Sequence, residues 1–296
     1  VPGAENLAGV ISSMQGKREW QQAVIDERPL DLFTGVALFA KKDSTEPVDL
    51  WKDAPVHGPI DNRWFLDNRI EIGFADAADR DPDRDGFSNR EEFDAKTKPN
   101  DPKSHPALIA KLTYVSQEAQ DWLLRFSMDI GADQNQFKFL HQAAPGKEFK
   151  MDMQDFAKPG DVIKFKEEGP GTGRFRLLKV EERDVLNERI NVMEKQKFAL
   201  VEDLKPNKAG EQFEVPRRMP DALAPKFIRR DRTAVLELRA IGSTGKTFKV
   251  EERTTFALPP GSADKAFLLK EVTDESVTVE FADEGGQKKS VVIPKG

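Results

Sequence analysis

Apolar and polar residues alternate with a period of two over much of the chain from Leu108 onward. The alternation recurs in short runs at 123–128, 136–140, 149–153, 162–165 and 175–180. A strand points successive side chains to opposite faces, so this period predicts strands with one face on a core and the other in water. Glycine-rich turns, such as Gly169 to Gly173, separate the runs. We therefore predict half-buried antiparallel sheet for this part of the chain.

Two short sequence patterns each occur twice in this region. The echoed segments are 146–150 (GKEFK) and 245–249 (GKTFK), then 175–181 (FRLLKVE) and 267–273 (FLLKEVT). A second alternating strand (190–193 or 277–281) and a third (198–201 or 291–293) follow in each copy. Alternating strands resemble one another by chance, but the shared order of turn, strand, loop and hairpin favours a duplicated small β-module.

Residues 1–60 lack a sustained period. Apolar residues at 7–14 predict a strand or a short helix, and those at 35–40 predict a buried strand followed by a turn. The stretch 50–60 contains two prolines and a glycine, which is typical of a linker. We therefore expect an irregular N-terminal region.

One acidic loop carries the most specific chemical pattern of the chain. Residues 81–92 have the form D-x-D-x-D-G-x-x-N-x-x-E, the ligand spacing of a calcium loop. Calcium takes six to eight oxygen ligands, and Gly86 at position 6 permits the sharp turn that such a loop needs. The predicted ligands are the side chains of Asp81, Asp83, Asp85, Asn89 and Glu92 and the carbonyl of Phe87. We predict Ca²⁺ as the one cofactor.

The alternative interpretation is a solvated acidic loop that binds no metal. Three arginines lie among the acids, at Arg80, Arg84 and Arg90, and they could only partly offset the mutual repulsion of the carboxylates. The full pattern, with its glycine, favours calcium over this alternative.

The segment from Asp81 to Pro106 resembles the thrombospondin-type-3-like calcium repeats of secreted bacterial proteins. The residues that carry the resemblance are Asp81, Asp83, Asp85, Gly86, Ser88, Asn89, Glu92, Phe93, Thr97, Pro99 and Pro102, with a short helix expected upstream at 62–68. The resemblance implies an exported protein and a structural calcium ion. Ser88 stands where signalling EF-hands place a branched apolar residue, and the chain has no second loop of this pattern, so a calcium switch is not implied.

These patterns divide the chain into four parts. They are an N-terminal region (1–60), a calcium-loop segment (61–106), a first β-domain (107–210) and a second β-domain (211–296). The expected fold class is mainly β, or α+β overall, with a short helix, calcium loop and helix followed by two small antiparallel β-modules.

Composition narrows the classes of function. The formal net charge of −6 argues against a nucleic-acid or anionic-membrane binder, and the absence of cysteine excludes disulfides and thiolate sites. No apolar run approaches the roughly 18 residues of a membrane span. The chain starts at Val1 with no initiator methionine, from which we expect a trimmed mature protein.

Other candidate sites are better explained as turns. The segment 240–247 resembles a phosphate loop but has Ala240 at the position of the first glycine and precedes a predicted strand. The glycines at 169–173 open no helix, which argues against a dinucleotide site. The histidines at 57, 105 and 141 are too far apart in sequence to form a metal motif. We expect no catalytic residues and no enzymatic activity.

The end of the chain, from Lys265 to Phe281, resembles the small periplasmic β-domains of PilP-type and GspC-type components of type IV pilus and type II secretion machines. Together with the calcium segment, the chain resembles envelope proteins of Verrucomicrobia from type IV pilus-like systems. This resemblance implies a non-enzymatic scaffold or docking component in the periplasm, the outer envelope or the extracellular space. The expected partners are other envelope or pilus-system proteins, with self-association through strand edges also open.

Two alternative functions remain from the sequence. One is an extracellular hydrolase or its secreted carbohydrate-binding accessory module, and the other is an adhesin that binds a host surface. Four tryptophans and a single tyrosine offer few of the aromatic platforms that carbohydrate-binding faces usually expose.

Overall fold

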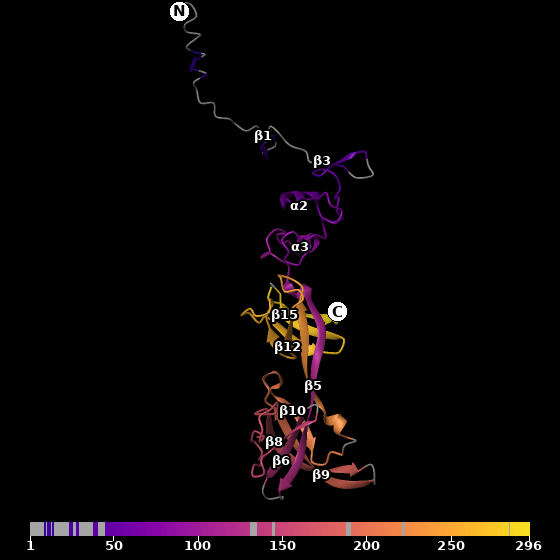
Figure 1. Ribbon diagram of the computed structural model, residues 1–296, viewed down its shortest axis with the longest axis vertical. Coiled ribbons are helices and arrows are strands. Elements are labelled where there is room, and N and C mark those ends of the chain that lie inside the picture. The colour runs from indigo at the N-terminus through magenta and orange to yellow at the C-terminus, as the bar shows by residue number, and fades with distance from the viewer. Residues whose placement is uncertain are drawn as a thin grey trace, which may run out of the picture. The chain divides into compact units, whose positions relative to one another are not determined.

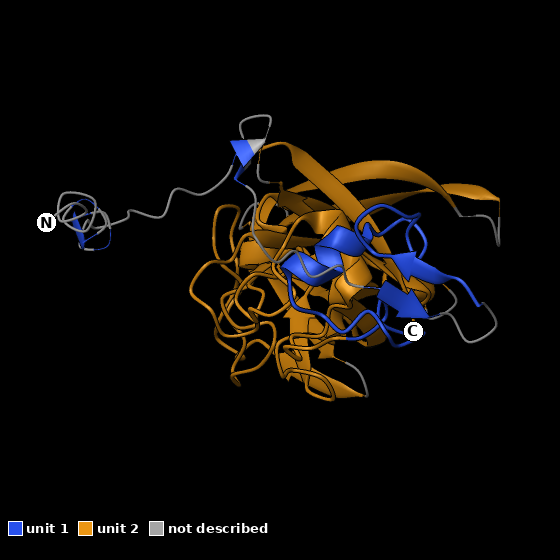
Figure 2. Cartoon of the chain, turned by 90° about the horizontal axis from the view of Figure 1, so that it is seen from above, with its two compact units in different colours: residues 1–80 blue, residues 81–296 orange. Residues whose placement is uncertain are grey.

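The computed structural model describes residues 45–130, 135–143, 146–187, 191–220, 223–283 and 285–296, with a few short pieces before 45. The chain forms two compact units, Val1–Arg80 and Asp81–Gly296, coloured separately in Figure 2. Strands prevail over helices in the described residues, and all paired strands are antiparallel. The fold is therefore mainly β, as the alternation predicts.

The first unit is built from short elements. Strand β1 (Val24–Ile25) pairs with β2 (Arg28–Pro29), and β3 (Leu38–Ala40) pairs with β4 (Pro47–Asp49). The predicted buried strand at 35–40 is thus a strand at its end, but Leu38 is 60% exposed, and residues 35–37 lie outside the described residues. The predicted element at 7–14 also lies largely outside them.

Helix α2 (Asn62–Asp67) follows, at the place predicted for a short helix, and the Asp61 side chain caps its N-terminus. Asn62 is fully buried, where it accepts a hydrogen bond from the Val56 amide and donates one to the Ala54 carbonyl. These bonds join the two sides of the boundary predicted at residue 60. The stretch 50–60 therefore packs into this unit, and Ile60 is completely buried.

The described residues of the second unit form three sheets. The five-stranded sheet has the order β12-β11-β5-β6-β7, from β5 (Leu112–Ile130), β6 (Gln136–Ala143), β7 (Lys147–Lys150), β11 (Arg229–Leu238) and β12 (Thr247–Glu251). A three-stranded sheet contains β8 (Phe175–Asn187), β9 (Val192–Asp203) and β10 (Glu211–Pro216). A four-stranded sheet contains β13 (Thr255–Phe256), β14 (Phe267–Val272), β15 (Ser276–Ala282) and β16 (Lys288–Pro294). Single 3₁₀ turns lie at η1 (Leu108–Lys111), η2 (Pro206–Lys208) and η3 (Ala224–Phe227).

Strand β5 is shared by two hydrophobic cores, and Figure 1 shows it running along both. Its first half pairs with β11, from Leu112 to Trp122, and its second half pairs with β6, from Trp122 to Ile130. The second half, with β6 to β10, encloses one core; we call residues 122–220 the first β-module. The first half, with β11 to β16, encloses the other; we call residues 107–121 and 223–296 the second β-module.

This arrangement differs from the division predicted at residue 210. Strand β10 begins at Glu211 and pairs with β9, so it belongs to the first β-module. The start of β5 belongs to the second β-module, because Leu112 and Tyr114 are buried in that core. Alternation reports which face of a strand is buried but not which strand lies beside it, so it gives no sign that one strand of 19 residues contributes to two cores.

The echoed segments occupy equivalent places in the two modules. Leu177 of β8 faces Val201 of β9, and Leu269 of β14 faces Val279 of β15. The register shifts immediately after both leucines, before Lys179 in one ladder and Glu271 in the other. These shared details support the predicted duplication.

The predicted assignment of strands within the first copy needs one correction. Segments 190–193 and 198–201 were expected to be two strands, but from Val192 onward both lie in the single strand β9, and Ile190 lies outside the described residues. The third strand of the first copy is β10. The prediction failed because β9 continues past the end of β10 without a turn, and a period of two gives no signal for where pairing with one neighbour ends.

Candidate calcium site

The acidic loop begins the second unit and leads into helix α3 (Asn89–Ala95). Ser88 caps this helix: its side chain accepts a hydrogen bond from the Glu91 amide, and the Glu91 carboxylate accepts one from the Ser88 amide. This capping box sets the position of the helix start. The glycine at position 6 has φ +98°, in the left-handed region that favours glycine.

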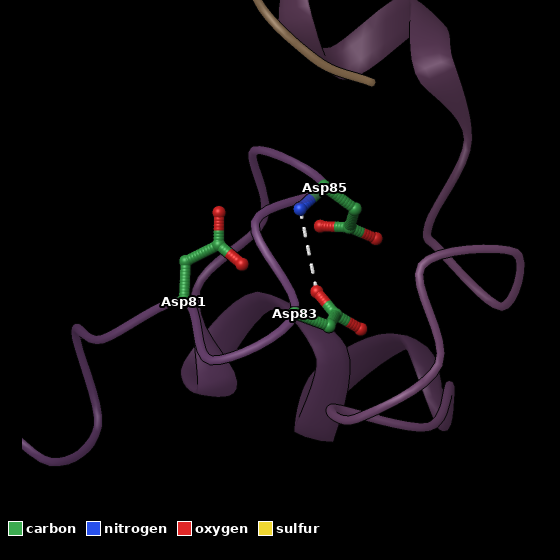
Figure 3. Close-up of side chains that lie close together, drawn as sticks. All are labelled: Asp81, Asp83 and Asp85. Carbon is green, nitrogen blue, oxygen red and sulfur yellow. Dashed lines mark hydrogen bonds between the residues drawn. The ribbon is translucent and has the colours of Figure 1, made fainter. Parts of the chain in front are cut away.

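Three of the predicted ligands converge. One carboxylate oxygen from each of Asp81, Asp83 and Asp85 lies within 4.8 Å of the others (Figure 3). Backbone amides of the loop hold these carboxylates in place: the Gly86 amide donates to Asp81 Oδ2 at 2.8 Å and the Phe87 amide to Asp85 Oδ1 at 2.8 Å. The alternating positions therefore point inward from a tight curl, as the spacing predicts.

Two further predicted ligands are buried at the start of α3. Asn89 and Glu92 are both 0% exposed, and Asp85 is 1% exposed. Glu92 Oε1 accepts a hydrogen bond from Thr97 Oγ1 at 3.2 Å. Phe87, whose carbonyl is the predicted sixth ligand, has its side chain buried as well.

The buried carboxylates are under-satisfied. Asp83 Oδ2, Asp85 Oδ2 and Glu92 Oε2 are buried and accept no hydrogen bond from any described residue. Buried polar atoms normally have a partner, and a buried charge requires a counter-charge. This set of hard oxygen atoms around one point is what a calcium ion coordinates, so the residues present fit the predicted metal.

The electrostatics of the loop agree with this geometry. Burial, and then the negative charge of Asp85, raises the pKa of Asp83 to about 6. Burial, and then the charges of Asp83 and Asp85, raises the pKa of Glu92 to about 7. Burial also raises the pKa of Asp85. A divalent cation in this position would reverse these shifts, because it favours the ionised carboxylates.

The loop is docked onto the second β-module. The Ile241 amide donates to the Asp85 carbonyl at 2.7 Å, and Lys111 forms an ion pair with Glu91 at 2.7 Å. The Phe87 side chain packs in a buried cluster with Leu108, Leu238 and Ala240. A backbone hydrogen bond, an ion pair and an apolar cluster therefore hold the loop against the second β-module.

Gly86 is required at this interface for a second reason. A Cβ atom on it would lie 2.8 Å from both the Arg239 carbonyl oxygen and the Ala240 Cα. The loop that provides these atoms, 239–246, connects β11 to β12, which agrees with the hairpin turn predicted there in place of a phosphate site. Sequence reasoning did not anticipate its contact with the calcium loop, since a hairpin turn carries no signal for what lies against it.

The glycines at 169–173 also have a packing role. A Cβ on Gly169 would lie 2.2 Å from the Phe149 ring, and one on Gly171 would lie 2.8 Å from His141 Nδ1. His141 is 0% exposed, and both of its ring nitrogens lack a hydrogen-bond partner among the described residues. Its imidazole is surrounded by the rings of Trp122, Phe149, Phe165 and Phe175. Burial, and then the positive charge of Arg174, lowers the pKa of His141 to about 4.

A buried ion cluster, which the sequence did not reveal, lies where the two β-modules meet. Arg174 is 5% exposed and bonds Asp203 Oδ2 at 2.7 Å and Asp231 Oδ2 at 2.6 Å. Lys208 also pairs with Asp231 at 2.8 Å, and Trp122 Nε1 donates to the same carboxylate. Asp231 comes from β11 and Asp203 from β9, so one guanidinium joins both modules.

Among the described residues, the three aspartates form the one group of acids, histidines and cysteines with metal-binding geometry. No helix in the described part of the chain is both long and apolar enough to cross a membrane. Comparison of the chain with protein-family models, with curated proteins and with solved structures gives no match.

Proposed function

We propose that the loop binds one calcium ion and that the ion has a structural role. The ligands are the side chains of Asp81, Asp83, Asp85, Asn89 and Glu92 with the carbonyl of Phe87. The observation that carries the proposal is the set of buried oxygens on Asp83, Asp85 and Glu92 that accept no hydrogen bond from the described residues. Without a cation these carboxylates would repel one another in a poorly solvated position.

The ion would fix the loop in the shape that docks onto the second β-module. The docking contacts use the Asp85 carbonyl and the Phe87 side chain, which lie within the ligand sequence itself. Ordering the ligands therefore orders the contacts with Ile241 and Leu238. The calcium ion would therefore have a structural role, because it would hold the loop in the shape that packs against the sheet.

We propose further that the protein is a non-enzymatic scaffold or docking component of a cell envelope, associated with a type IV pilus-like or secretion system. The resemblance of the calcium segment and of the terminal β-strands supports this proposal. The sheets also end in strands that offer backbone groups to a partner, among them β7, β12 and β16. Partners of this kind are identified by pull-down of the intact protein from its native envelope.

Substitution at the loop tests the metal proposal. We expect Asp85→Asn to abolish the rise in melting temperature that calcium gives to the wild type, because it removes the charge of a buried ligand. Asp94→Asn is the matched control: it makes the same chemical change at an exposed position of α3. Calorimetric titration with calcium chloride measures binding directly. Equal calcium responses in the wild type and Asp85→Asn would overturn the assignment.

A further inference from the structure

Strand β16 forms one edge of the four-stranded sheet, and most of its outer side is unpaired. The strand forms a ladder with β15 and with no other strand of the described residues. Past its end, the Gly296 amide donates to the Tyr114 carbonyl at 3.0 Å, so β5 occupies the edge from there onward. The unpaired part is therefore residues 288–292, which we call the free edge.

The ladder with β15 shows which residues direct their backbone groups toward the free edge. The Asp283 amide donates to the Gln287 carbonyl at 2.9 Å, and the Lys295 amide donates to the Glu275 carbonyl at 2.7 Å. Both bonds follow the register of this ladder, in which hydrogen-bonded and non-hydrogen-bonded pairs alternate. Odd-numbered residues of β16 therefore direct their backbone groups toward β15, and even-numbered residues direct theirs outward. The outward residues of the free edge are Lys288, Ser290 and Val292.

The side chains of the free edge are basic at one end and apolar at the other. Lys288 and Lys289 are exposed, Val291 is 36% exposed and Val292 is 62% exposed. Lysines on an edge strand oppose pairing with a further strand when they meet like charges. Their effect on a given partner therefore depends on which residues come to lie opposite them.

A second copy of β16 fits the free edge when a two-fold axis passes through Ser290. An axis normal to the sheet makes the two strands antiparallel and keeps each residue on its own face, so outward residues meet outward residues. Ser290 then lies opposite its own copy, and Lys288 lies opposite Val292 of the second copy. On the other face, Lys289 lies opposite Val291 of the second copy. No lysine faces a lysine, and each outward pair can exchange two backbone hydrogen bonds.

The neighbouring symmetric registers are unfavourable. Moving the axis to either lysine of the free edge places that lysine directly opposite its own copy, which is destabilising. Moving it to either valine places Pro294 opposite an outward residue of the second copy. Proline has no amide hydrogen to donate, and β5 already lies beside this end of the strand. The distribution of charge and backbone donors thus selects the register with the axis at Ser290.

We propose that two copies of the chain pair through β16 about an axis at Ser290, which joins their four-stranded sheets edge to edge. Each lysine of the free edge extends its apolar stem along a valine of the other copy and keeps its ammonium group in water. Because both copies use the same surface, the contact is isologous and closes with two copies. The interface is at the small end of specific contacts, so the dimer fraction rises with concentration.

Single cysteines test the register, because the chain has no cysteine of its own. In the Ser290→Cys dimer the two Cα atoms would lie about 5.5 Å apart, within the reach of a disulfide. In Lys288→Cys or Val292→Cys the two equivalent positions would be offset by roughly 13 Å along the strands, which no disulfide spans. Under mild oxidation we expect a covalent dimer from Ser290→Cys and none from either other variant alone. A 1:1 mixture of Lys288→Cys and Val292→Cys should give a covalent dimer, since these positions lie opposite each other.

Ser290→Pro and Ser290→Thr test the backbone pairing. Ser290 is exposed and its amide is directed away from β15, so proline breaks no ladder bond within one copy. It removes an outward donor from each copy, and the dissociation constant from sedimentation velocity should rise at least about tenfold. Ser290→Thr keeps the amide and is the matched control, which should associate as the wild type does. Thermal melting shows whether each variant is folded, and the cysteine variants decide the question if Ser290→Pro is not.

Several outcomes would overturn the proposal. A wild type that stays monomeric at every concentration would leave the free edge to a different protein. Equal crosslinking of Ser290→Cys and Val292→Cys, a mixture that gives no covalent dimer, or unchanged association of folded Ser290→Pro would each contradict the register. The inference does not rest on the calcium proposal, because β16 contains none of the predicted ligands.

Discussion

Lowering the pH should reduce the free energy of unfolding of this protein, because one histidine is buried in its neutral form. His141 has a pKa of about 4 in the folded protein, against 6.5 when it is exposed. Between these values the unfolded chain binds a proton that the folded chain does not, so stability is complete above pH 6.5 and falls as the pH drops toward 4. The charged groups that act on the ring are Arg174, which opposes protonation, and Asp231, which favours it.

The magnitude follows from the same two values. Between pH 7 and pH 5 the difference corresponds to about 1 to 2 kcal/mol of unfolding free energy, with allowance for solvent screening. With a urea dependence of about 2 kcal/mol per molar, the unfolding midpoint should fall by about 0.5 to 1 M. This part of the pH dependence should vanish in His141→Leu, which keeps an apolar side chain of similar size in the aromatic cluster.

The assay is urea unfolding of both proteins at pH 7 and pH 5 with saturating calcium, which keeps the carboxylates of the loop in one state. His141→Leu changes packing as well, but that change is the same at both pH values, so the difference between the two proteins isolates the proton. Proton NMR of the three imidazoles gives the pKa of His141 directly. Equal pH dependence of the two proteins, or a His141 pKa near 6.5, would refute the reasoning.

Two further substitutions test the packing of the second unit. Arg174→Met should destabilise the protein by about 3 kcal/mol, because it leaves Asp203 and Asp231 buried without their main partner. Arg176→Met, which breaks a partly exposed pair with Glu202, should cost less than about 1 kcal/mol, and equal losses in urea unfolding would contradict a role for burial. Gly86→Ala should lower the melting temperature and weaken calcium binding, because its Cβ would clash with Arg239 and strain the loop. Gly242→Ala also sits at positive φ but meets no neighbouring atom, so it measures the backbone strain alone, and an equally small effect of both would argue against close docking.

The sequence predicted features that depend on near neighbours in the chain. The spacing of Asp81, Asp83 and Asp85 specifies a curl because each ligand is two residues from the next, and the structure brings their carboxylates together. The alternation at 123–128 likewise predicts the strand that contains Trp122 and Phe126, since burial on one face repeats with the pleat.

Features that depend on distant segments were not predictable in this way. The pairing of β5 with β11 joins residues more than 100 positions apart, and nothing in either strand specifies the other. The ion cluster of Arg174 was missed for a related reason. A single arginine between strands looks like a solvated surface residue until the fold brings Asp203 and Asp231 against it.

The shared strand also has a mechanical consequence. A chain pulled from its N-terminal side transmits the load first to the seated loop, through the bond between Asp85 and Ile241 and the pair between Glu91 and Lys111. The load then enters β5 along the axis of the strand. The ladder bonds to β6 and β11 lie across that axis, so the force shears many of them together instead of opening them one after another. Strand β5 can therefore carry tension from one end of the unit through both cores.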